Sequence, residues 1–358
     1  MTLRISLATY DDGPPIGGQG VLVCGLRAAL HRRGVDVHTV AGRGEYGQRH
    51  PALTRRAPLD FSIELNRHPR RLYEGNPALV HAMGGPGGVL LLRRLEVPLV
   101  YTANHTYRQA YASSRPQRLL SIAERRAYRA AAKVLPISPS TADAVRALGV
   151  PSRRIEVILP GVDVDRFDRG EAKREPERVL FVGRLEWEKG PLDAVRCIRH
   201  LAQDRRGLRG VVIGRGALEG AVRNAVDSAR RAGVSIDLLG AVSDDELAEQ
   251  FARATVVIVP SRYEGLGLVA LEAMAGGAAV VGTDVTGLRD AVGDRGVLVE
   301  PDAPDRLADA VAMLLDHPAQ RGELTARARE HVREHHSWDT VGARVMEIYR
   351  GVAPAAAG

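Results

Sequence analysis

Two glutamates are the residues of this sequence best suited to bind hydroxyl groups. Glu264 follows an apolar run expected to be a strand and shares a turn with Gly265 and Gly267, while Glu272 lies within the helix expected over residues 268–277. Glycines in such a turn leave backbone N–H groups accessible at a helix N-terminus, where anions and polar hydroxyls bind. Paired carboxylates accept hydrogen bonds from the vicinal hydroxyls of a sugar or a ribose. Because the helix around Glu272 is otherwise apolar, its carboxylate needs a partner, which favours a binding role over a surface one.

Two cations follow a second apolar run, the strand expected over residues 178–185. The segment VGRLEWEKG places Gly183 before Arg184 and Lys189. A guanidinium and an ammonium that lie after a strand and before a helix can each pair with phosphate oxygens, as a diphosphate requires. Cations in loops are more often simply solvated, so this segment indicates a diphosphate site only in combination with the two glutamates.

A third glycine-containing segment, DDGPPIGGQG, joins the first expected strand to the first expected helix. Gly17 and Gly18 at the start of that helix can offer backbone N–H groups to a phosphate. The segment is not a P-loop, because no Gly-Lys-Ser/Thr follows it, and its glycine spacing does not match the dinucleotide-binding fingerprint.

The elements that must position these residues follow from the alternation of short apolar runs with amphipathic segments. Strands are expected at residues 3–9, 35–41, 77–83, 97–104, 131–138, 154–160, 178–185, 210–216, 235–242, 255–261, 278–283 and 296–300. Helices are expected at residues 18–34, 87–96, 191–204, 244–254 and 268–277, and over most of 305–350. Strands rich in Val, Ile and Leu that alternate with helices predict an α/β fold with parallel sheets covered on both faces.

A polar, charged segment at residues 163–178 interrupts this alternation and predicts the junction between two domains. We expect a first Rossmann-like domain over 1–165, a second over 166–336 and a C-terminal helix with a tail over 337–358. Two doubly wound sheets in tandem would place the carboxyl ends of their strands, where ligands bind, on either side of a central cleft.

The overall composition is that of an ordinary globular protein, with 45% hydrophobic and 26% charged residues. No signal peptide and no apolar run of about 18 residues is visible, so a cytoplasmic location is expected. Cys24 and Cys197 are far apart and belong to no metal-binding motif, so both are expected to be buried thiols.

Positive charge is concentrated in the first half of the chain. Residues 1–165 contain 23 Lys and Arg against 13 Asp and Glu, whereas residues 166–358 contain 27 against 30, and the whole chain carries +7. A basic half predicts an anionic partner, either a phosphorylated or carboxylated acceptor or the inner face of an anionic membrane. The basic amphipathic segment 117–133 suits a membrane surface, with a packed helix and solvated arginines as the alternative. Nucleic acid is disfavoured, because aromatic residues make up only 4% of the chain and no stacking platform accompanies the arginines.

These segments, taken in order, resemble glycosyltransferase family 4, a large group of retaining glycosyltransferases with the GT-B fold. The family's glutamate–seven residues–glutamate motif is matched by Glu264 and Glu272, and its VGRL…KG motif by VGRLEWEKG. The N-terminal glycine pair of the family is matched by Gly17 and Gly18, and the histidine after an N-domain strand by His105.

Two further segments extend the resemblance over essentially the whole chain. The interdomain motif of the family is matched by LPGVD at residues 159–163. A Ser-Trp pair at residues 337–338 precedes the last helix, which in the family crosses back to the first domain.

The resemblance implies the transfer of a hexosyl group from a nucleoside-diphosphate sugar to a hydroxyl acceptor, with retention of configuration. It implies no cofactor and no metal ion. The acceptor would be a sugar, a lipid-linked glycan or a small molecule.

The resemblance also assigns roles to individual residues. Arg184 and Lys189 would hold the diphosphate, Glu272 would accept the ribose hydroxyls, and Glu264 would contact the transferred sugar. His105 would lie beside the reacting sugar, which makes it a catalytic candidate together with Arg184, Lys189 and Glu264. The full set of residues expected to bind the donor is Gly17, Gly18, Gly183, Arg184, Lys189, Glu264, Gly265, Leu266, Gly267 and Glu272.

Two residues at strand ends are candidates for the acceptor side of the cleft, Ser138 and His81. A structural role is an equally good interpretation of His81. Asp163 and Asp165 have the Asp-x-Asp spacing of a metal motif in a different glycosyltransferase fold, but they fall in the domain junction, so no metal site is expected.

Other functions are compatible with two Rossmann-like domains. A sugar-nucleotide epimerase needs further acid and base carboxylates, and a phosphorylase usually carries a pyridoxal lysine, neither of which is evident in the sequence. A nucleotide-binding scaffold without turnover is a third alternative. The intact set of candidate site residues counts against it.

Overall fold

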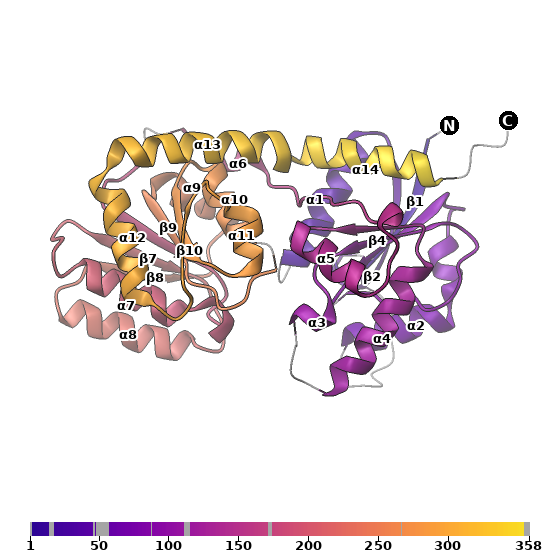
Figure 1. Ribbon diagram of the computed structural model, residues 1–358, viewed down its shortest axis with the longest axis horizontal. Helices are drawn as coiled ribbons and strands as arrows, with labels where there is room; N and C mark the ends of the chain where they lie inside the picture. The colour runs from indigo at the N-terminus through magenta and orange to yellow at the C-terminus, as the bar shows by residue number, and fades with distance from the viewer. Residues whose placement is uncertain are drawn as a thin grey trace. The chain divides into compact units, whose positions relative to one another are not determined.

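A computed structural model places these elements in space and describes residues 2–13, 18–45, 47, 57–86, 88–110, 115–170, 174–265 and 267–353. The chain divides into two compact units (Figure 1). Unit 1 comprises Met1–Gly161 and Trp338–Gly358, and unit 2 comprises Val162–Ser337. Each unit is an α/β structure with one parallel sheet, as the sequence predicts. Within the described residues, no helix is both long and apolar enough to cross a bilayer.

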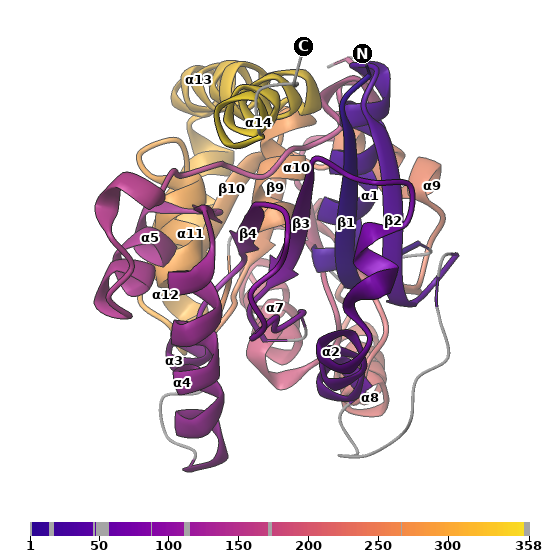
Figure 2. The ribbon, with the colours of Figure 1, turned by 90° about the vertical axis from the view of Figure 1, so that its right-hand side faces the viewer.

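The sheet of unit 1 has five strands in the order β2-β1-β3-β4-β5, all parallel. Its strands are β1 (Arg4–Asp11), β2 (Asp36–Arg43), β3 (Leu79–Gly84), β4 (Leu99–Ala103) and β5 (Lys133–Pro136). Figure 2 shows β2, β1, β3 and β4 side by side. The strand order reverses between β1 and β3, which is where the carboxyl ends of a parallel sheet form a ligand crevice.

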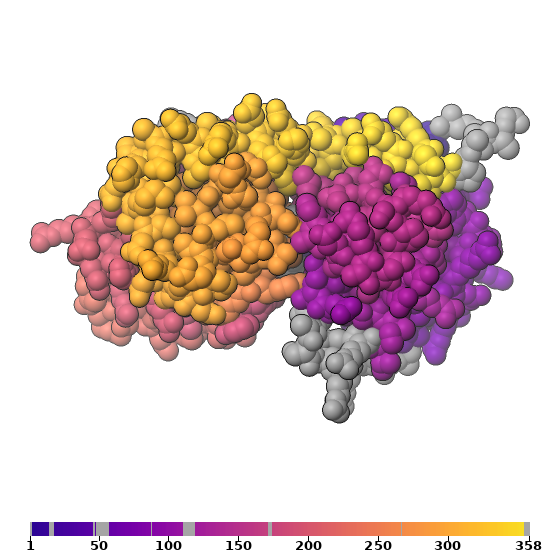
Figure 3. Space-filling view, viewed as in Figure 1, coloured from indigo at the N-terminus to yellow at the C-terminus, as the bar shows by residue number. Residues whose placement is uncertain are grey.

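Helices cover both faces of this sheet. They are α1 (Gly18–Arg32), α2 (Ala57–Arg67), α3 (Tyr107–Ala110), α4 (Arg115–Ala130), α5 (Pro139–Ala147) and α14 (Trp338–Val352). One apolar cluster joins the sheet to α1 and α14, and another joins it to α2, α4 and α5. The C-terminal helix α14 thus returns to the first unit, and the space-filling view shows it lying against the surface of that unit (Figure 3).

A glycine of α1 allows this return. A Cβ atom on Gly25 would lie 2.0 Å from the ring of Trp338, the first residue of α14, so only glycine leaves room for the indole. Gly161, at the end of the first stretch of unit 1, contacts the same ring, because a Cβ there would lie 2.3 Å from it. Trp338 therefore joins the two separate stretches of chain that form unit 1.

The sheet of unit 2 has six parallel strands in the order β11-β10-β9-β6-β7-β8. Its strands are β6 (Arg178–Val182), β7 (Arg209–Ile213), β8 (Ile236–Gly240), β9 (Val256–Val259), β10 (Ala279–Thr283) and β11 (Val297–Val299). The α-helices of unit 2 are α6 (Val164–Phe167), α7 (Pro191–Leu201), α8 (Glu219–Arg231), α9 (Asp244–Arg253), α10 (Leu268–Ala275), α11 (Thr286–Val292), α12 (Pro304–Asp316) and α13 (Pro318–His336). An apolar cluster on one face of this sheet includes residues of α7, α8 and α12.

The helix expected over residues 87–96 is wrong, because the described residues 88–96 form no helix. Their backbone N–H groups are bonded to side chains of α2 instead. Leu90 N donates to Ser62 Oγ at 3.1 Å, and Leu92 N donates to Asn66 Oδ1 at 2.7 Å. Side-chain acceptors that satisfy backbone donors compete with helix formation.

The strand expected over residues 154–160 is also absent as a regular element. The segment makes one isolated bridge, between Ile155 and Val134, and then runs beside β5. Ile158 N donates to the carbonyl of Pro136 at 2.9 Å, so the segment adds backbone bonds to the sheet edge without forming a strand.

The break between the units falls after Gly161, four residues before the boundary expected at 165. Val162 belongs to unit 2 because it forms a bridge with Ser337, and its N–H donates to the carbonyl of His336 at 2.6 Å. The chain therefore passes between the units twice, at 161–162 and at 337–338.

Candidate functional site

The two loops that carry the predicted site residues of unit 2 leave neighbouring strands. β6 pairs with β9, with Leu180 opposite Val257, so the loops that follow these strands start from adjacent positions at the carboxyl edge of the sheet. This adjacency explains why residues more than seventy positions apart in sequence lie together, since the sequence separation of Lys189 and Glu264 is 75.

Lys189 and Glu264 form an ion pair at the meeting point of these loops. Lys189 Nζ lies 2.6 Å from Glu264 Oε2, and Ser261 Oγ donates to the same oxygen at 3.2 Å. The side chains of Lys189 and Glu264 are 22% and 14% exposed, so the pair is partly shielded yet open to a ligand. Charge-assisted contacts of this kind fix both side chains in position.

Two glycines allow the backbones of this region to approach each other. Gly190 ends the first loop with φ 64°, and a Cβ atom there would lie 2.1 Å from the carbonyl oxygen of Pro260. Gly287, in α11, would place a Cβ 2.2 Å from the carbonyl oxygen of Glu264. A side chain at either position would push apart the loops that hold the ion pair.

Arg184 lies on the first loop and is the more exposed of the two predicted cations. Its Nη2 donates to Glu188 Oε1 at 2.8 Å, and its side chain is 55% exposed. The loop beneath it is held by backbone bonds from Gly183 N to Ile213 O at 3.0 Å and from Leu185 N to the carbonyl of Arg215 at 2.8 Å. The guanidinium is therefore accessible to an anion, while backbone hydrogen bonds hold the loop beneath it.

Glu272 lies in α10 and differs from Glu264 in having no hydrogen bond or ion pair to any described residue. The residue is half-buried. Burial raises the pKa of Glu272 to about 7, while the positive charge of Arg166 acts in the opposite direction. A carboxylate that is partly buried and has no partner among the described residues is suited to accept hydrogen bonds from a ligand.

The N-terminus of α10 lies between the two glutamates. Its N-cap is Gly267 in the left-handed conformation, with φ 77°, and no side chain of the described residues caps the helix. The first backbone N–H groups of a helix have no partner within the helix and attract anions and hydroxyl oxygens.

Arg262 is a residue that the sequence reasoning missed. Its Nη2 lies 2.5 Å from Asp193 Oδ2, its Nε lies 2.7 Å from Asp302 Oδ1, and its Nη1 donates to the carbonyl of Trp187 at 3.1 Å. The guanidinium also stacks 5.0 Å from the centroid of the Trp187 ring. In addition, Arg262 N donates to the carbonyl of Glu188 at 2.9 Å, so this arginine ties the Lys189 loop to the Glu264 loop.

Two candidates of unit 1, His105 and Gly18, lie outside its strands. His105 follows β4 and is half-buried, and the carbonyl of His105 would lie 2.6 Å from a Cβ on Gly85, which follows β3. Gly18 is the first residue of α1 and is exposed. Gly17, like Leu266 in unit 2, lies outside the described residues.

His81 is fully buried in the middle of β3 rather than at its end. Its Nδ1 lies 2.5 Å from the hydroxyl of Tyr349 in α14, and its Nε2 lies 2.8 Å from Thr102 Oγ1 in β4. Burial lowers the pKa of His81 to about 3, so the ring is neutral. With both nitrogens occupied and no exposed surface, His81 holds α14 on the sheet, which favours the structural alternative over contact with an acceptor.

Ser138 is also fully buried, and it is the N-cap of α5. Its Oγ accepts a hydrogen bond from Thr141 N at 3.2 Å. Capping satisfies one of the unpaired N–H groups of a helix start, which accounts for a serine here without any ligand.

Asp163, of the Asp-x-Asp sequence, is likewise an N-cap, because its carboxylate accepts from Arg166 N at 3.3 Å at the start of α6. Among the described residues, no group of three or more His, Cys, Asp and Glu side chains is placed to hold a metal ion. Cys24 is half-buried and Cys197 is buried, and both are free thiols.

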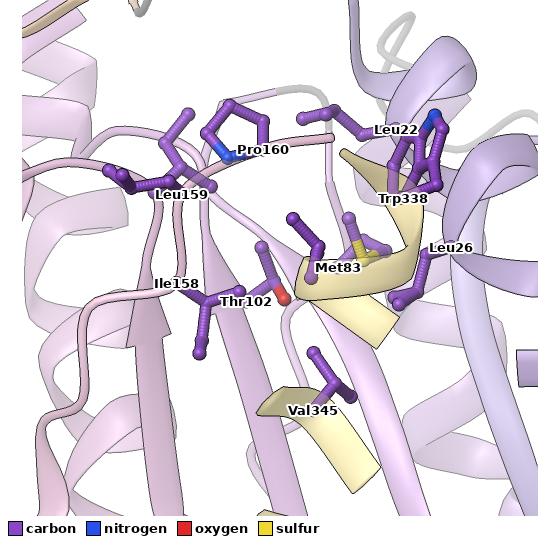
Figure 4. Close-up of a pocket in the computed structure, with 11 residues that line it drawn as sticks. Leu22, Leu26, Met83, Thr102, Ile158, Leu159, Pro160, Trp338 and Val345 are labelled. Atoms are coloured by element: carbon purple, nitrogen blue, oxygen red, sulfur yellow. The ribbon is translucent and has the colours of Figure 1, made fainter. Parts of the chain in front are cut away.

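Unit 1 also contains an apolar pocket between its sheet and α14. Figure 4 shows Leu26, Met83, Val345 and Trp338 around it, with Thr102 as its polar side chain. The Thr102 hydroxyl is already bonded to His81. Because none of the described residues that line this pocket is ionisable, its chemistry differs from that of the loops in unit 2.

Comparison with known proteins assigns both halves of the chain. A model for "Glycosyl transferases group 1" matches residues 163–331, and a model for "Glycosyltransferase Family 4" matches residues 16–166. A D-inositol 3-phosphate glycosyltransferase of Xylanimonas cellulosilytica is 31% identical over 385 residues, which cover 93% of this chain and 91% of that protein. A glycogen synthase of Mycobacterium tuberculosis is 30% identical over 286 residues, which cover 76% of this chain and 68% of that protein.

A solved structure supports the fold. The structure of HepE from Anabaena in complex with UDP-glucose has a TM-score of 0.71 and 17% sequence identity, and the match covers 98% of this chain and 100% of that one. The chain therefore belongs to the group 1 glycosyltransferases of glycosyltransferase family 4 and has their GT-B fold of two Rossmann-like domains.

Proposed function

We propose that this glycosyltransferase transfers a hexosyl group from a nucleoside-diphosphate sugar to a hydroxyl acceptor, with retention of anomeric configuration and without a metal ion. The observation that carries the proposal is the meeting of Lys189 and Glu264 on loops from adjacent strands. Arg184 lies on one of these loops, and the unpartnered Glu272 lies in the helix after the other. Two cations and an open carboxylate match the diphosphate and the ribose of such a donor.

The cations account for the departure of the diphosphate. As the bond between the anomeric carbon and the phosphate oxygen breaks, negative charge grows on that oxygen. In this proposal Arg184 and Lys189 stabilise this charge together with the N-terminus of α10, for which the described residues provide no side-chain cap. In this scheme the cations supply the stabilisation that a divalent metal would otherwise provide.

The proposed transfer occurs on one face of the sugar. The acceptor oxygen forms its bond to the anomeric carbon on the side from which the diphosphate leaves, and the acceptor proton passes to the departing phosphate oxygen. No additional carboxylate nucleophile is then needed, which leaves Glu264 to hold Lys189 and to contact the hydroxyls of the transferred sugar.

The relatives indicate which substrates to test first. HepE was solved with UDP-glucose, and the matched proteins are named as a glycogen synthase and as D-inositol 3-phosphate glycosyltransferases. A UDP-hexose donor with a sugar or a phosphorylated polyol as acceptor is therefore the first combination to try. The positive charge of the first half of the chain agrees with an anionic acceptor.

A thermal-shift panel of UDP, GDP, ADP, TDP and CDP, each with EDTA and with magnesium, tests the donor assignment. A ligand at 100 times its Kd stabilises the fold by about 2.7 kcal/mol, which is a clear rise in Tm. We expect one diphosphate to stabilise the protein in EDTA. Stabilisation by none of them, or only with magnesium, would contradict the donor site and its metal independence.

The stereochemical part of the proposal needs its own experiment. Proton NMR of the product made from an α-linked donor is expected to show an α-linkage. A β-linked product would contradict retention even if the nucleotide binds as expected.

A further inference from the structure

Helix α4 of unit 1 has an exposed apolar edge. Its inner face is fully buried at Glu124, Ala127 and Tyr128. On the outer face, Leu119 is 72% exposed and Ile122 is 65% exposed, and their spacing of three residues places them side by side. They are the two most exposed aliphatic side chains of the described residues, and Figure 1 shows α4 projecting at the lower edge of its unit.

Arginines continue the same face towards the end of the helix. Arg125, Arg126 and Arg129 are exposed and lie three to seven positions after Ile122. Within the described residues, none of the three side chains forms an ion pair or a hydrogen bond. We call Leu119, Ile122, Arg125, Arg126 and Arg129 the α4 face.

Helix α8 of unit 2 is a second basic amphipathic helix, and it differs from α4 in the exposure of its aliphatic side chains and in the pairing of its arginines. Its aliphatic side chains Val222 and Val226 are buried. Two of its arginines are paired, Arg223 with Glu219 at 3.1 Å and Arg230 with Asp237 at 3.1 Å. In α8 the aliphatic side chains are covered and two of the three arginines are paired, whereas the α4 face has two exposed aliphatic side chains and three arginines without an ion pair among the described residues.

We propose that the α4 face docks unit 1 on an anionic lipid surface. Leu119 and Ile122 enter the boundary between headgroups and acyl chains, and the three arginines contact lipid phosphates. This pairing of exposed aliphatic side chains with unpaired cations on one helical face is what binding in a membrane interface requires. The charge of the arginines is complementary to anionic headgroups, and each basic residue near such a surface contributes about a fivefold increase in binding.

The proposal is independent of the donor site, because its test measures binding to lipid without substrate. The full chain is sedimented with vesicles of 70% phosphatidylcholine and 30% phosphatidylglycerol and with vesicles of phosphatidylcholine alone. We expect binding to the anionic vesicles only, weakened by high salt, because screening shortens the reach of the arginines.

Two variants separate the charged and apolar parts of the α4 face. Arg125→Gln/Arg126→Gln/Arg129→Gln is expected to weaken vesicle binding at least tenfold. Leu119→Gln/Ile122→Gln is expected to weaken it severalfold and to leave its salt dependence unchanged. Thermal unfolding checks that both variants remain folded, as exposed positions should allow.

Matched controls lie in unit 2. Arg199, Arg206 and Arg231 are exposed arginines without an ion pair among the described residues, and Leu239 is 39% exposed. Arg199→Gln/Arg206→Gln/Arg231→Gln and Leu239→Gln are expected to bind vesicles like the unmodified chain. Equal losses in the controls, or unchanged binding in the α4 variants, would overturn the proposal.

A second copy of the chain could also cover an exposed apolar edge, and sedimentation velocity distinguishes this case from lipid binding. We expect the same oligomeric state for the unmodified chain and for Leu119→Gln/Ile122→Gln. A dimer that dissociates in this variant would show that a second copy covers the α4 face, and would overturn the lipid assignment.

Discussion

His81 in unit 1 and Glu272 in unit 2 are both ionisable groups on buried elements, and they differ in their hydrogen-bond partners. Both ring nitrogens of His81 are bonded to hydroxyls, and its pKa falls to about 3. Glu272 has no hydrogen bond within the described residues, and its pKa rises to about 7. Burial disfavours the charged form in both cases, so the difference lies in the partners.

The contrast separates polar groups with a structural role from those proposed to bind a ligand. His81, Ser138 and Asp163 have their hydrogen bonds completed by the protein, and each supports a helix. In unit 2, Arg184 is exposed and Glu272 has no partner in the part of the chain that the structure describes, so a ligand can complete their hydrogen bonds. An unsatisfied polar group in a half-buried position is a cost to the fold that a bound ligand removes.

The largest expected effect is that of Lys189→Ala on activity. Removing the ammonium deprives the departing diphosphate of one cation and leaves Glu264 as an unpaired negative charge beside it. We expect kcat/KM to fall by about 100-fold or more, in steady-state assays with the preferred donor.

The matched control for this variant is Lys133→Ala in unit 1, which breaks the ion pair with Glu156 at 3.3 Å. This pair is half-buried and lies at β5, outside the loops proposed to bind the donor, so activity is expected to stay within about twofold. An equal loss of activity in Lys189→Ala and Lys133→Ala would contradict a specific role of Lys189 in donor binding.

A smaller effect is expected for Glu272→Gln. A neutral amide is a weaker acceptor for ribose hydroxyls, so the Kd for the diphosphate is expected to rise roughly tenfold, measured by calorimetry at pH 8. In the unmodified enzyme the carboxylate becomes protonated as the pH falls through about 7, so donor affinity should decrease in that range. The variant should lack this pH dependence, and a dependence identical to that of the unmodified enzyme would contradict the role.

The same variant has an opposite expected effect on stability. The folded-state pKa of Glu272 is raised from 4.5, so its contribution to stability is present below pH 4.5 and is lost as the pH rises through about 7. Glutamine cannot ionise, and the ligand-free variant is expected to have a higher Tm at pH 8 than the unmodified chain. A lower Tm would indicate that the carboxylate supports the fold.

Tyr349→Phe tests the structural side of the comparison. The change removes the hydroxyl that bonds His81 Nδ1 and leaves a buried polar atom unsatisfied, which costs about 1–3 kcal/mol of unfolding free energy in denaturant titration. Donor Kd is expected to stay unchanged. Tyr73→Phe serves as the control with a smaller loss, because among the described residues the Tyr73 hydroxyl accepts a hydrogen bond from the exposed Glu96 N alone, at 3.0 Å.

The smallest expected effect is that of Ser138→Ala. Loss of the N-cap of α5 is expected to cost about 1 kcal/mol of stability, similar to Ser243→Ala at the N-cap of α9. Activity at 25 °C should be unchanged in both. A fall in kcat/KM in Ser138→Ala but not in Ser243→Ala would instead support a role of Ser138 in binding the acceptor.

Much of the fold follows from local patterns in the sequence. Apolar runs at residues 178–185 and 255–261 predict strands, and the structure has β6 and β9 there. Local patterns do not predict which strands pair with each other. For example, β6 pairs with β9, which lies more than seventy residues later in the sequence. The segment 87–96 has a helical pattern, yet hydrogen bonds from α2 side chains override it.

The site was predictable to the extent that motifs carry it. Lys189 and Glu264 were expected from separate motifs, and the structure joins them. Arg262 was missed because its partners Asp193 and Asp302 are distant in sequence and a single arginine in a loop gives no local signal. For His81 and Ser138 the motif reasoning erred in the other direction. Their expected positions at strand ends suggested contact with a ligand, but both residues are buried and bonded within the protein.

A crystal structure with the diphosphate that stabilises the protein in EDTA tests the central claim most directly. We predict that its phosphates contact Arg184 and Lys189 in unit 2, and that its ribose hydroxyls lie within hydrogen-bond distance of the Glu272 carboxylate. A nucleotide bound elsewhere, or held through a metal ion with Glu272 still unpartnered, would contradict the account.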